Sequence, residues 1–475
     1  MANDELCYLS ATEALALFKR RELSPVELLE AVIARAESVR DDVNPFADQY
    51  FEKSLRNARK AENRYAKVKP RTRRLEGIPL VIKDSVSVRG TRSTGGSLIN
   101  ADHIGEVSDP SVERLLRAGA NFFARTTCPE FCWLFATHSR LWGVTRNPWR
   151  LDVTPGGSSG GSGAALATGA TTLAIGSDST GSIRQPAAQC GVVAYQAPHG
   201  RNPLGAGASF HPYVHVGPMT RTVADAALMQ NIMSGYHPLD HNSLRNKVTI
   251  APERKGIEGL RVAYSIDLGH FEVIHDVRRE TEEAMRALKD AGAVVEEVDV
   301  TWAGEATRLA HLSEEFIFAG VLDDALAKHA DKVSDYVAQL AETAHSATAD
   351  DYRRALQVAG EVWYEHLGPL LSHYDVFICP GVSCPEVPAE NWQKDVIEIN
   401  GKQLTDTDTA MTAIFNMFGR CPVLSVPSGL TDAGLPTGLQ IVGRPFDDPT
   451  VFRVASAFEQ QRPWLDTPSR RPPLG

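Results

Sequence analysis

The sequence predicts an α/β fold, a single large domain with a twisted mixed β-sheet covered by helices on both faces. Two observations predict it. Helix patterns alternate with short apolar strand patterns along most of the chain, which is typical of a sheet that has helices on each face. The 475 residues also show no internal repeat and no sharp linker, so one unit spanning residues 1–475 is favoured over several.

The first forty residues predict two helices. Ser10 and Glu13 have the spacing of a capping box ahead of an apolar stretch. Ser24 and Glu27 repeat this pattern, with Pro25 at the first helical position. Both helices should therefore begin at a capping serine.

Helix and strand patterns then alternate. We expect a helix at 110–118 before a strand at 120–124, a helix at 162–170 before a strand at 171–175, a helix at 277–291 before a strand at 294–300, and short apolar strands at 375–379 and 422–426. Residues 303–368 are mostly helical in pattern. The wider region 254–371 is therefore expected to be an insertion or a cap over the sheet.

Composition excludes several classes of protein. The chain has 49 Lys and Arg against 59 Asp and Glu, a net charge of −10, which argues against a nucleic-acid binder. No apolar run approaches the ~20 residues needed to span a bilayer, and the N-terminus shows no secretory signal. Seven scattered cysteines indicate reduced thiols rather than a disulfide framework. A cytoplasmic protein without a membrane or nucleic-acid partner is expected.

A Gly/Ser-rich stretch at 154–163 is the most unusual segment. A flexible linker is one interpretation, but an Ala-rich helix pattern and an apolar strand follow at once. A phosphate loop is another, but it requires a Gly-Lys-Ser/Thr ending, and no lysine lies between residues 158 and 200. Glycines between packed elements more often allow a sharp turn or a close backbone approach.

Two further segments could carry chemistry. Residues 176–186 follow a strand and place Ser182 in a tight Gly/Ser/Thr turn, where backbone N–H groups could hold an oxyanion. Residues 77–84 form an apolar strand pattern that ends at Lys83. A lysine that acts as a base must be neutral, and burial favours the neutral form. Each segment alone is also compatible with an ordinary turn or a solvated lysine.

Together these three segments resemble the amidase signature family. The motifs are Gly-Ile-Pro-Leu-x-Ile-Lys-Asp at 77–84, Gly-Gly-Ser-Ser-Gly-Gly-Ser at 156–162 and Gly-Ser-Asp-x-x-Gly-Ser-Ile-Arg-x-Pro-Ala-Ala at 176–188. Further matches lie at 145–149, 190–193, 217–225 and 434–445. The resemblance covers roughly residues 10–240 and 375–459.

The resemblance implies a Ser–cisSer–Lys site. Ser182 matches the nucleophile, Ser158 a serine that follows a cis peptide bond, and Lys83 the catalytic lysine. The family's oxyanion hole corresponds here to the backbone N–H groups of Ser179, Thr180, Gly181 and Ser182. A hydroxyl is a poor nucleophile until a base removes its proton. In this scheme the Ser182 proton passes through Ser158 to Lys83, and the same path later returns a proton to the leaving nitrogen.

Other residues are given supporting roles. Gly157, Asp178 and Arg184 are expected to brace the nucleophile segment rather than to touch the substrate. A place in the core is the plainer interpretation of the apolar stretch around Phe131, Cys132 and Trp133. In the family, however, this neighbourhood borders the substrate channel, so these residues are also candidate pocket walls.

The resemblance implies hydrolysis of amide-type C–N bonds through an acyl-enzyme on Ser182, without a metal or organic cofactor. Linear small apolar or aryl amides, anilides and carbamates are the expected substrates, with esterase as a side activity. The alternative is the glutaminase component of a tRNA-dependent amidotransferase, which would need partner subunits. The resemblance allows a monomer or a homodimer.

One departure from the family pattern concerns Thr180, where many members have glycine. A β-branched residue resists positive φ and narrows the space beside the nucleophile. Residues 195–200, Tyr-Gln-Ala-Pro-His-Gly, also replace the Gly-Leu-Lys-Pro-x-x-Gly stretch that is more usual in the family. These changes concern the substrate pocket more than the chemistry.

Overall fold

A mixed sheet of eleven strands forms the centre of the computed structural model, which describes residues 3–69, 71–251, 256–390, 397–465 and 467–473. The strand order is β1-β3-β2-β6-β8-β7-β14-β15-β11-β9-β10. The strands span Phe46–Gln49 (β1), Pro79–Lys83 (β2), Asn121–Thr126 (β3), Leu173–Asp178 (β6), Val193–Gln196 (β7), His215–Thr220 (β8), Arg261–Tyr264 (β9), Val294–Glu297 (β10), Val376–Pro380 (β11), Val423–Leu430 (β14) and Pro436–Gly443 (β15).

The sheet combines parallel and antiparallel pairs. Strands β3, β2 and β6 run parallel to one another, as do β11, β9 and β10. Antiparallel pairs join these two groups through β8, β7, β14 and β15. Two small sheets lie outside it, β4 (His138–Ser139) with β5 (Gly143–Val144) and β12 (Ile397–Ile399) with β13 (Lys402–Leu404). The mixed α/β sheet expected from the sequence is confirmed.

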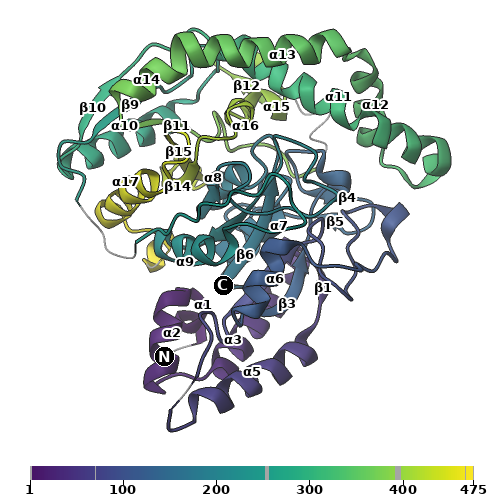
Figure 1. Cartoon of the computed structure of the whole chain (residues 1–475), viewed down its shortest axis with the longest axis vertical. Coiled ribbons are helices and arrows are strands. Elements are labelled where there is room, and N and C mark those ends of the chain that lie inside the picture. The colour runs from purple at the N-terminus through teal and green to yellow at the C-terminus, as the bar shows by residue number, and fades with distance from the viewer. Residues whose placement is uncertain (1–2, 70, 252–255, 391–396, 466, 474–475) are drawn as a thin grey trace.

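Helices cover both faces of this sheet (Figure 1). On β15, Leu439 and Ile441 pack in an apolar cluster with α10 and α17, whereas Val442 belongs to the cluster that includes α11 and α16. The longer helices are α2 (Ala11–Arg20), α3 (Pro25–Ser38), α5 (Phe51–Tyr65), α6 (Pro110–Arg117), α7 (Gly160–Ala167), α8 (Arg184–Cys190), α9 (Val223–Met233), α10 (His275–Asp290), α11 (Ala303–His329), α12 (Asp335–Ser346), α13 (Ala349–Val362) and α17 (Asp448–Gln461).

Shorter helices fill the connections. They are α1 (Asn3–Tyr8), α4 (Arg40–Val43), α14 (Gly368–His373), α15 (Asp406–Thr409) and α16 (Ile414–Met417), with 3-10 turns at Leu98–Asn100, Glu130–Cys132, Ala330–Lys332 and Pro468–Arg470 and a π turn at Trp363–Leu367. No helix among the described residues is long and apolar enough to cross a membrane.

The predicted helix starts agree with the structure. Ser10 caps α2 and Ser24 caps α3, each within a complete capping box, and Pro25 is the first residue of α3. The predicted helix–strand pairs correspond to α6–β3, α7–β6 and α10–β10, and the two apolar runs correspond to β11 and β14. The bounds differ from the expected ones by a few residues.

The region expected to be an insertion or cap is mostly helical, although its residues 254 and 255 lie outside the described residues. Helices α11 to α13 form an arch at one end of the molecule, far from the N-terminal helices (Figure 1). Leu322 of α11 and Val337 of α12 pack against Leu134 and Ala136 in one apolar cluster. The Tyr336 hydroxyl accepts a hydrogen bond from the backbone N–H of Glu130 at 2.6 Å, so α12 is fixed to the segment around residue 130.

Candidate active site

The ends of two parallel strands bring the motif residues together. Lys83 is the last residue of β2 and Asp178 the last residue of β6, and these strands are neighbours in the sheet. Ligand sites in α/β proteins form at such carboxyl ends. Ser182 follows β6 in the turn before α8, and Ser158 lies two residues before α7.

Lys83 is fully buried and contacts hydroxyl groups. Its Nζ donates to Ser158 Oγ at 2.7 Å and to Ser177 Oγ at 3.0 Å. The neighbouring carboxylate of Asp84 turns away and accepts bonds from Thr94 and Arg125 instead. Within the described residues Lys83 therefore forms no ion pair, and its amine can exchange a proton with Ser158.

A backbone hydrogen bond joins the segments that contain Ser158 and Ser182. The backbone N–H of Ser159 donates to the carbonyl of Ser182 at 3.0 Å. Ser158 is fully buried and Ser182 is 5% exposed. The peptide bond between Gly157 and Ser158 is cis, as the resemblance led us to expect. A side chain at Gly157 would meet the Leu134 carbonyl oxygen at 2.4 Å, so the close backbone approach there requires glycine.

A buried ion pair between Asp178 and Arg184 holds the turn that contains Ser182. The Asp178 carboxylate accepts bonds from the backbone N–H groups of Gly181 (2.8 Å) and Ile183 (3.3 Å) and from Arg184 Nε (3.0 Å). Arg184 Nη2 (3.1 Å) and Asn416 Nδ2 (2.8 Å) also donate to this carboxylate. Burial alone would raise the pKa of Asp178, but the Arg184 charge and these hydrogen bonds outweigh burial and lower it to about 2.

Arg184 is also fully buried and points away from the serines. Its Nη1 donates to the Thr412 carbonyl at 3.0 Å and to Gln440 Oε1 at 2.7 Å, and its Nη2 donates to Asn416 Oδ1 at 2.6 Å. These contacts agree with the bracing role expected for Asp178 and Arg184. They connect the turn that contains Ser182 to β15 and to residues 412–416.

Three of the four candidate oxyanion N–H groups have no acceptor among the described residues: those of Ser179, Thr180 and Ser182. The fourth, Gly181 N–H, donates to Asp178. Gly181 carries the positive φ of this turn, +121°, and Thr180 does not have a positive φ. The β-branched Thr180 is therefore accommodated without backbone strain.

The serines open onto a cavity of about 1070 Å³. Phe131, Cys132 and Trp133 line it, as the family resemblance suggested, and Phe135 and Phe318 add apolar surface. The rings of Trp133 and Phe318 meet edge-on at 5.4 Å between centroids. Phe131 and Cys132 both have positive φ, 53° and 64°, which turns this wall toward the cavity.

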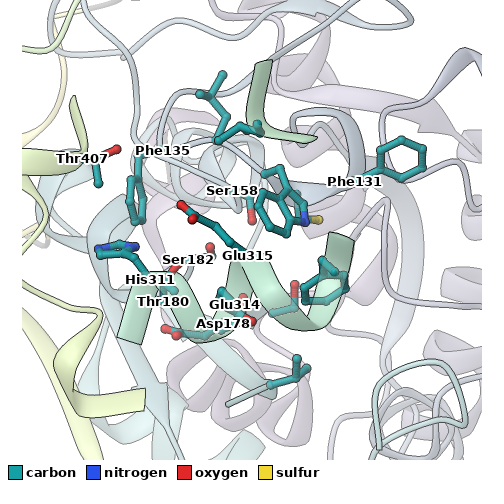
Figure 2. Close-up of a pocket in the computed structure, with 18 of the residues that line it drawn as sticks. Phe131, Phe135, Ser158, Asp178, Thr180, Ser182, His311, Glu314, Glu315 and Thr407 are labelled. Carbon is teal, nitrogen blue, oxygen red and sulfur yellow. The ribbon is translucent and has the colours of Figure 1, made fainter. Parts of the chain in front are cut away.

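Helix α11 forms the cavity wall opposite the serines. The sequence motifs gave no indication of this wall. His311, Glu314 and Glu315 of this helix line the cavity, and Figure 2 shows α11 passing in front of Ser158 and Ser182. Ser177, the second hydroxyl on Lys83, was also missed. A signal for α11 does exist in the sequence, since Thr307, His311 and Glu315 recur every four residues within an apolar-rich helix.

Comparison with known proteins identifies the family. The amidase family model matches residues 27–452. An acylamidase of Rhodococcus erythropolis is 33% identical over 478 residues, which cover 98% of each chain. A component of the glutamyl-tRNA(Gln) amidotransferase of Carboxydothermus hydrogenoformans is 30% identical over 481 residues, covering 96% of this chain and 98% of that one.

Solved structures agree with this result. A bacterial aryl acylamidase of the amidase signature family superposes with a TM-score of 0.88 at 28% identity, over 96% of this chain and 97% of that one. The corresponding glutamyl-tRNA(Gln) amidotransferase component of Thermotoga maritima superposes with a TM-score of 0.76 at 26% identity, over 97% and 96%. The chain belongs to the amidase signature family, and it is an amide hydrolase of that family.

Proposed function

We propose that this chain hydrolyses aryl amides and anilides by itself, with Ser182 as the nucleophile, Ser158 as the proton relay and Lys83 as the base. The observation that carries the proposal is the 2.7 Å contact of Lys83 Nζ with Ser158 Oγ at the floor of the cavity that Ser182 also lines. The apolar and aromatic walls of that cavity support an aryl group as part of the substrate.

The reaction proceeds in two halves. Ser182 Oγ attacks the amide carbonyl while its proton passes through Ser158 to neutral Lys83. The oxyanion accepts hydrogen bonds from the free N–H groups of the 179–182 turn. Lys83 then returns the proton through Ser158 to the nitrogen, and the C–N bond breaks to give the amine and an acyl-enzyme. Water attacks the acyl-enzyme through the same relay, which releases the acid and restores Ser182.

We further propose that the helices of residues 303–368 act as a cap over the site. The packing of α11 and α12 on residues 130–136 supports this role, because the same helices form the cavity wall opposite the serines.

The test is hydrolysis of p-nitroanilides by the purified chain without partners. Ser182→Ala should abolish release of p-nitroaniline, and Ser179→Ala is the matched control, because only the backbone of Ser179 has a proposed role. Full activity of Ser182→Ala would refute the nucleophile assignment. Carbamates and aryl esters in the same screen would define the side activities.

The second candidate is the glutaminase component of an amidotransferase, which the 30% identity to such a component favours. That function predicts that the isolated chain is inactive on anilides and hydrolyses glutamine only in a complex. The large aromatic cavity favours the first candidate, because glutamine has no aryl group to bury. Co-purification with other proteins of such a complex would favour the second.

A further inference from the structure

One face of α11 carries three polar side chains whose buried atoms lack partners. Thr307, His311 and Glu315, here called the α11 stripe, are four residues apart, so they lie in a row along the helix. All three line the cavity that contains Ser158 and Ser182. Thr307 Oγ1, His311 Nε2 and Glu315 Oε2 are inaccessible to solvent and have no hydrogen-bond partner among the described residues.

Such a row requires an explanation. About 90% or more of buried polar groups in proteins are hydrogen-bonded, because an unpaired buried group is unfavourable. Three successive exceptions on one helix face, all in the catalytic cavity, indicate a surface that is completed by a bound molecule. Figure 2 shows the Glu315 side chain in the space between α11 and Ser158, and the His311 ring beside Phe135, both at the wall of the cavity.

Glu315 differs from the other carboxylates of the cavity wall. Each of those has a hydrogen-bond or ion-pair partner: Asp109, Asp178, Glu272, Glu314, Asp406 and Asp408. Its neighbour Glu314 forms no hydrogen bond among the described residues either, but it lies within ion-pair distance of His211, 2.5 Å from Nε2. No ion pair or hydrogen bond involves Glu315 within the described part of the chain, so this carboxylate is the one that lacks a partner.

No cationic side chain among the described residues of the cavity wall neutralises the Glu315 carboxylate. Of the cationic side chains on the cavity wall, Arg308 is exposed and Lys402 pairs with Glu272. Burial raises the pKa of Glu315, with no cation acting against it. Burial lowers the pKa of His311 to about 4, so its imidazole is neutral at pH 7 and can act as a hydrogen-bond donor or acceptor.

Aromatic rings flank the same place. The Phe135 ring lies edge-on to His311, with 6.0 Å between the ring centroids. Aromatic faces attract cations, and the attraction strengthens when the cation is desolvated. A carboxylate without a partner beside aromatic rings is a suitable environment for a protonated nitrogen.

We propose that the α11 stripe binds a protonated amine or amidine substituent of the amide substrate, with Glu315 as its counter-ion. This inference rests on the proposed function and narrows it to cationic amides. Thr307 Oγ1 and the neutral imidazole of His311 accept the remaining hydrogen bonds of the protonated nitrogen group. The cationic group can belong to the acyl part or to the amine part of the substrate, and the two arms of the experiment separate these cases.

The experiment compares isosteric substrates that differ in one ammonium group. On the acyl side, the p-nitroanilides of 5-aminopentanoic acid and hexanoic acid are compared. On the amine side, 4′-(aminomethyl)acetanilide and 4′-ethylacetanilide are compared. The wild-type chain should prefer the cationic member of one pair by about tenfold or more in kcat/KM, mainly through KM, because a counter-ion contributes to ground-state binding.

Variants connect this preference to the stripe. Glu315→Gln should reduce the cationic-to-neutral ratio to about one. Glu315→Lys should reverse the preference toward the p-nitroanilide of adipic acid, which carries a carboxylate. The matched control is Glu305→Gln, an exposed glutamate on the same helix outside the cavity, which should leave the ratio unchanged.

A binding measurement separates this inference from the proposed function. Calorimetry with Ser182→Ala should show tighter binding of the cationic member of the favoured pair, and this readout does not need turnover. Equal affinities together with a kinetic ratio near one in both arms would overturn the inference and leave the anilide hydrolase intact. Tighter binding of the cationic ligand without any turnover by the wild type would support the stripe and refute the proposed function.

Discussion

Replacing Asp178 by asparagine tests the ion pair that braces the Ser182 turn. The carboxylate is the buried counter-ion of Arg184 and accepts hydrogen bonds from Arg184, Asn416 and two backbone N–H groups. Asparagine has one acceptor oxygen and would direct its NH₂ group at other donors. Removing one partner of a buried ion pair costs about 3–5 kcal/mol, because the remaining charge is buried without compensation.

The cost can be expressed as a shift in melting temperature. An unfolding entropy of about 2.1 cal/mol/K per residue amounts to about 1.0 kcal/mol/K for a chain of this length. A loss of about 4 kcal/mol therefore lowers the Tm by about 4 °C. Differential scanning calorimetry at pH 7 measures this shift, and Asp102→Asn, an exposed aspartate, is the matched control.

The pH dependence gives a second, independent readout. The pKa of Asp178 falls from its usual 3.8 to about 2, which corresponds to about 2 kcal/mol of stability. Since the folded-state pKa is depressed, this stability is complete above about pH 4 and is lost as the pH falls toward 2. Asp178→Asn should lose that part of the acid sensitivity. An unchanged Tm at pH 7 and an unchanged acid transition would refute the brace.

Three further predictions concern neighbouring groups. Lys83→Met should lower kcat for a p-nitroanilide about 10²–10⁴-fold, the usual contribution of a general base, with the circular dichroism spectrum retained; a loss of less than tenfold would exclude it as the base. The hydrogen bond with Cys128 lowers the pKa of the Cys132 thiol, because it stabilises the thiolate. Iodoacetamide should therefore inactivate the enzyme even at pH 6.5, where an ordinary thiol is only about 1% ionised. Cys132→Ala should resist this treatment, and inactivation of that variant at the same rate would contradict the reasoning. Tyr336→Phe leaves the Glu130 N–H without its acceptor and should lower the free energy of unfolding in urea by about 1–3 kcal/mol. An unchanged free energy of unfolding would show that this hydrogen bond does not stabilise the contact of α12 with residue 130.

The sequence predicted correctly those features that depend on neighbouring residues in the chain, such as helix starts and buried strands. The capping boxes at Ser10 and Ser24 predicted two helix starts, and the apolar run before Lys83 predicted a buried strand. The long family motifs predicted that Lys83, Ser158 and Ser182 meet, and Lys83 contacts Ser158 at the cavity that both serines line. The role of each side chain in the reaction stays a prediction.

Other parts of the site could not be read from the sequence, because they depend on tertiary contacts. Nothing local to Arg184 indicates that Gln440 and Asn416 satisfy its guanidinium. The α11 stripe has a four-residue period, but only the fold determines that this face meets the serines. Ser177 likewise reaches Lys83 only because β6 and β2 are neighbours in the sheet.

The bonds of Arg184 to residues 228, 232 and 256 positions further along the chain have a consequence for biosynthesis. All three motif side chains have been translated once residue 182 is complete, yet Arg184, which braces the Ser182 turn, obtains these partners only when residues 412–440 emerge from the ribosome. A prematurely terminated product ending near residue 400 would therefore contain every reactive group and still lack hydrolytic activity.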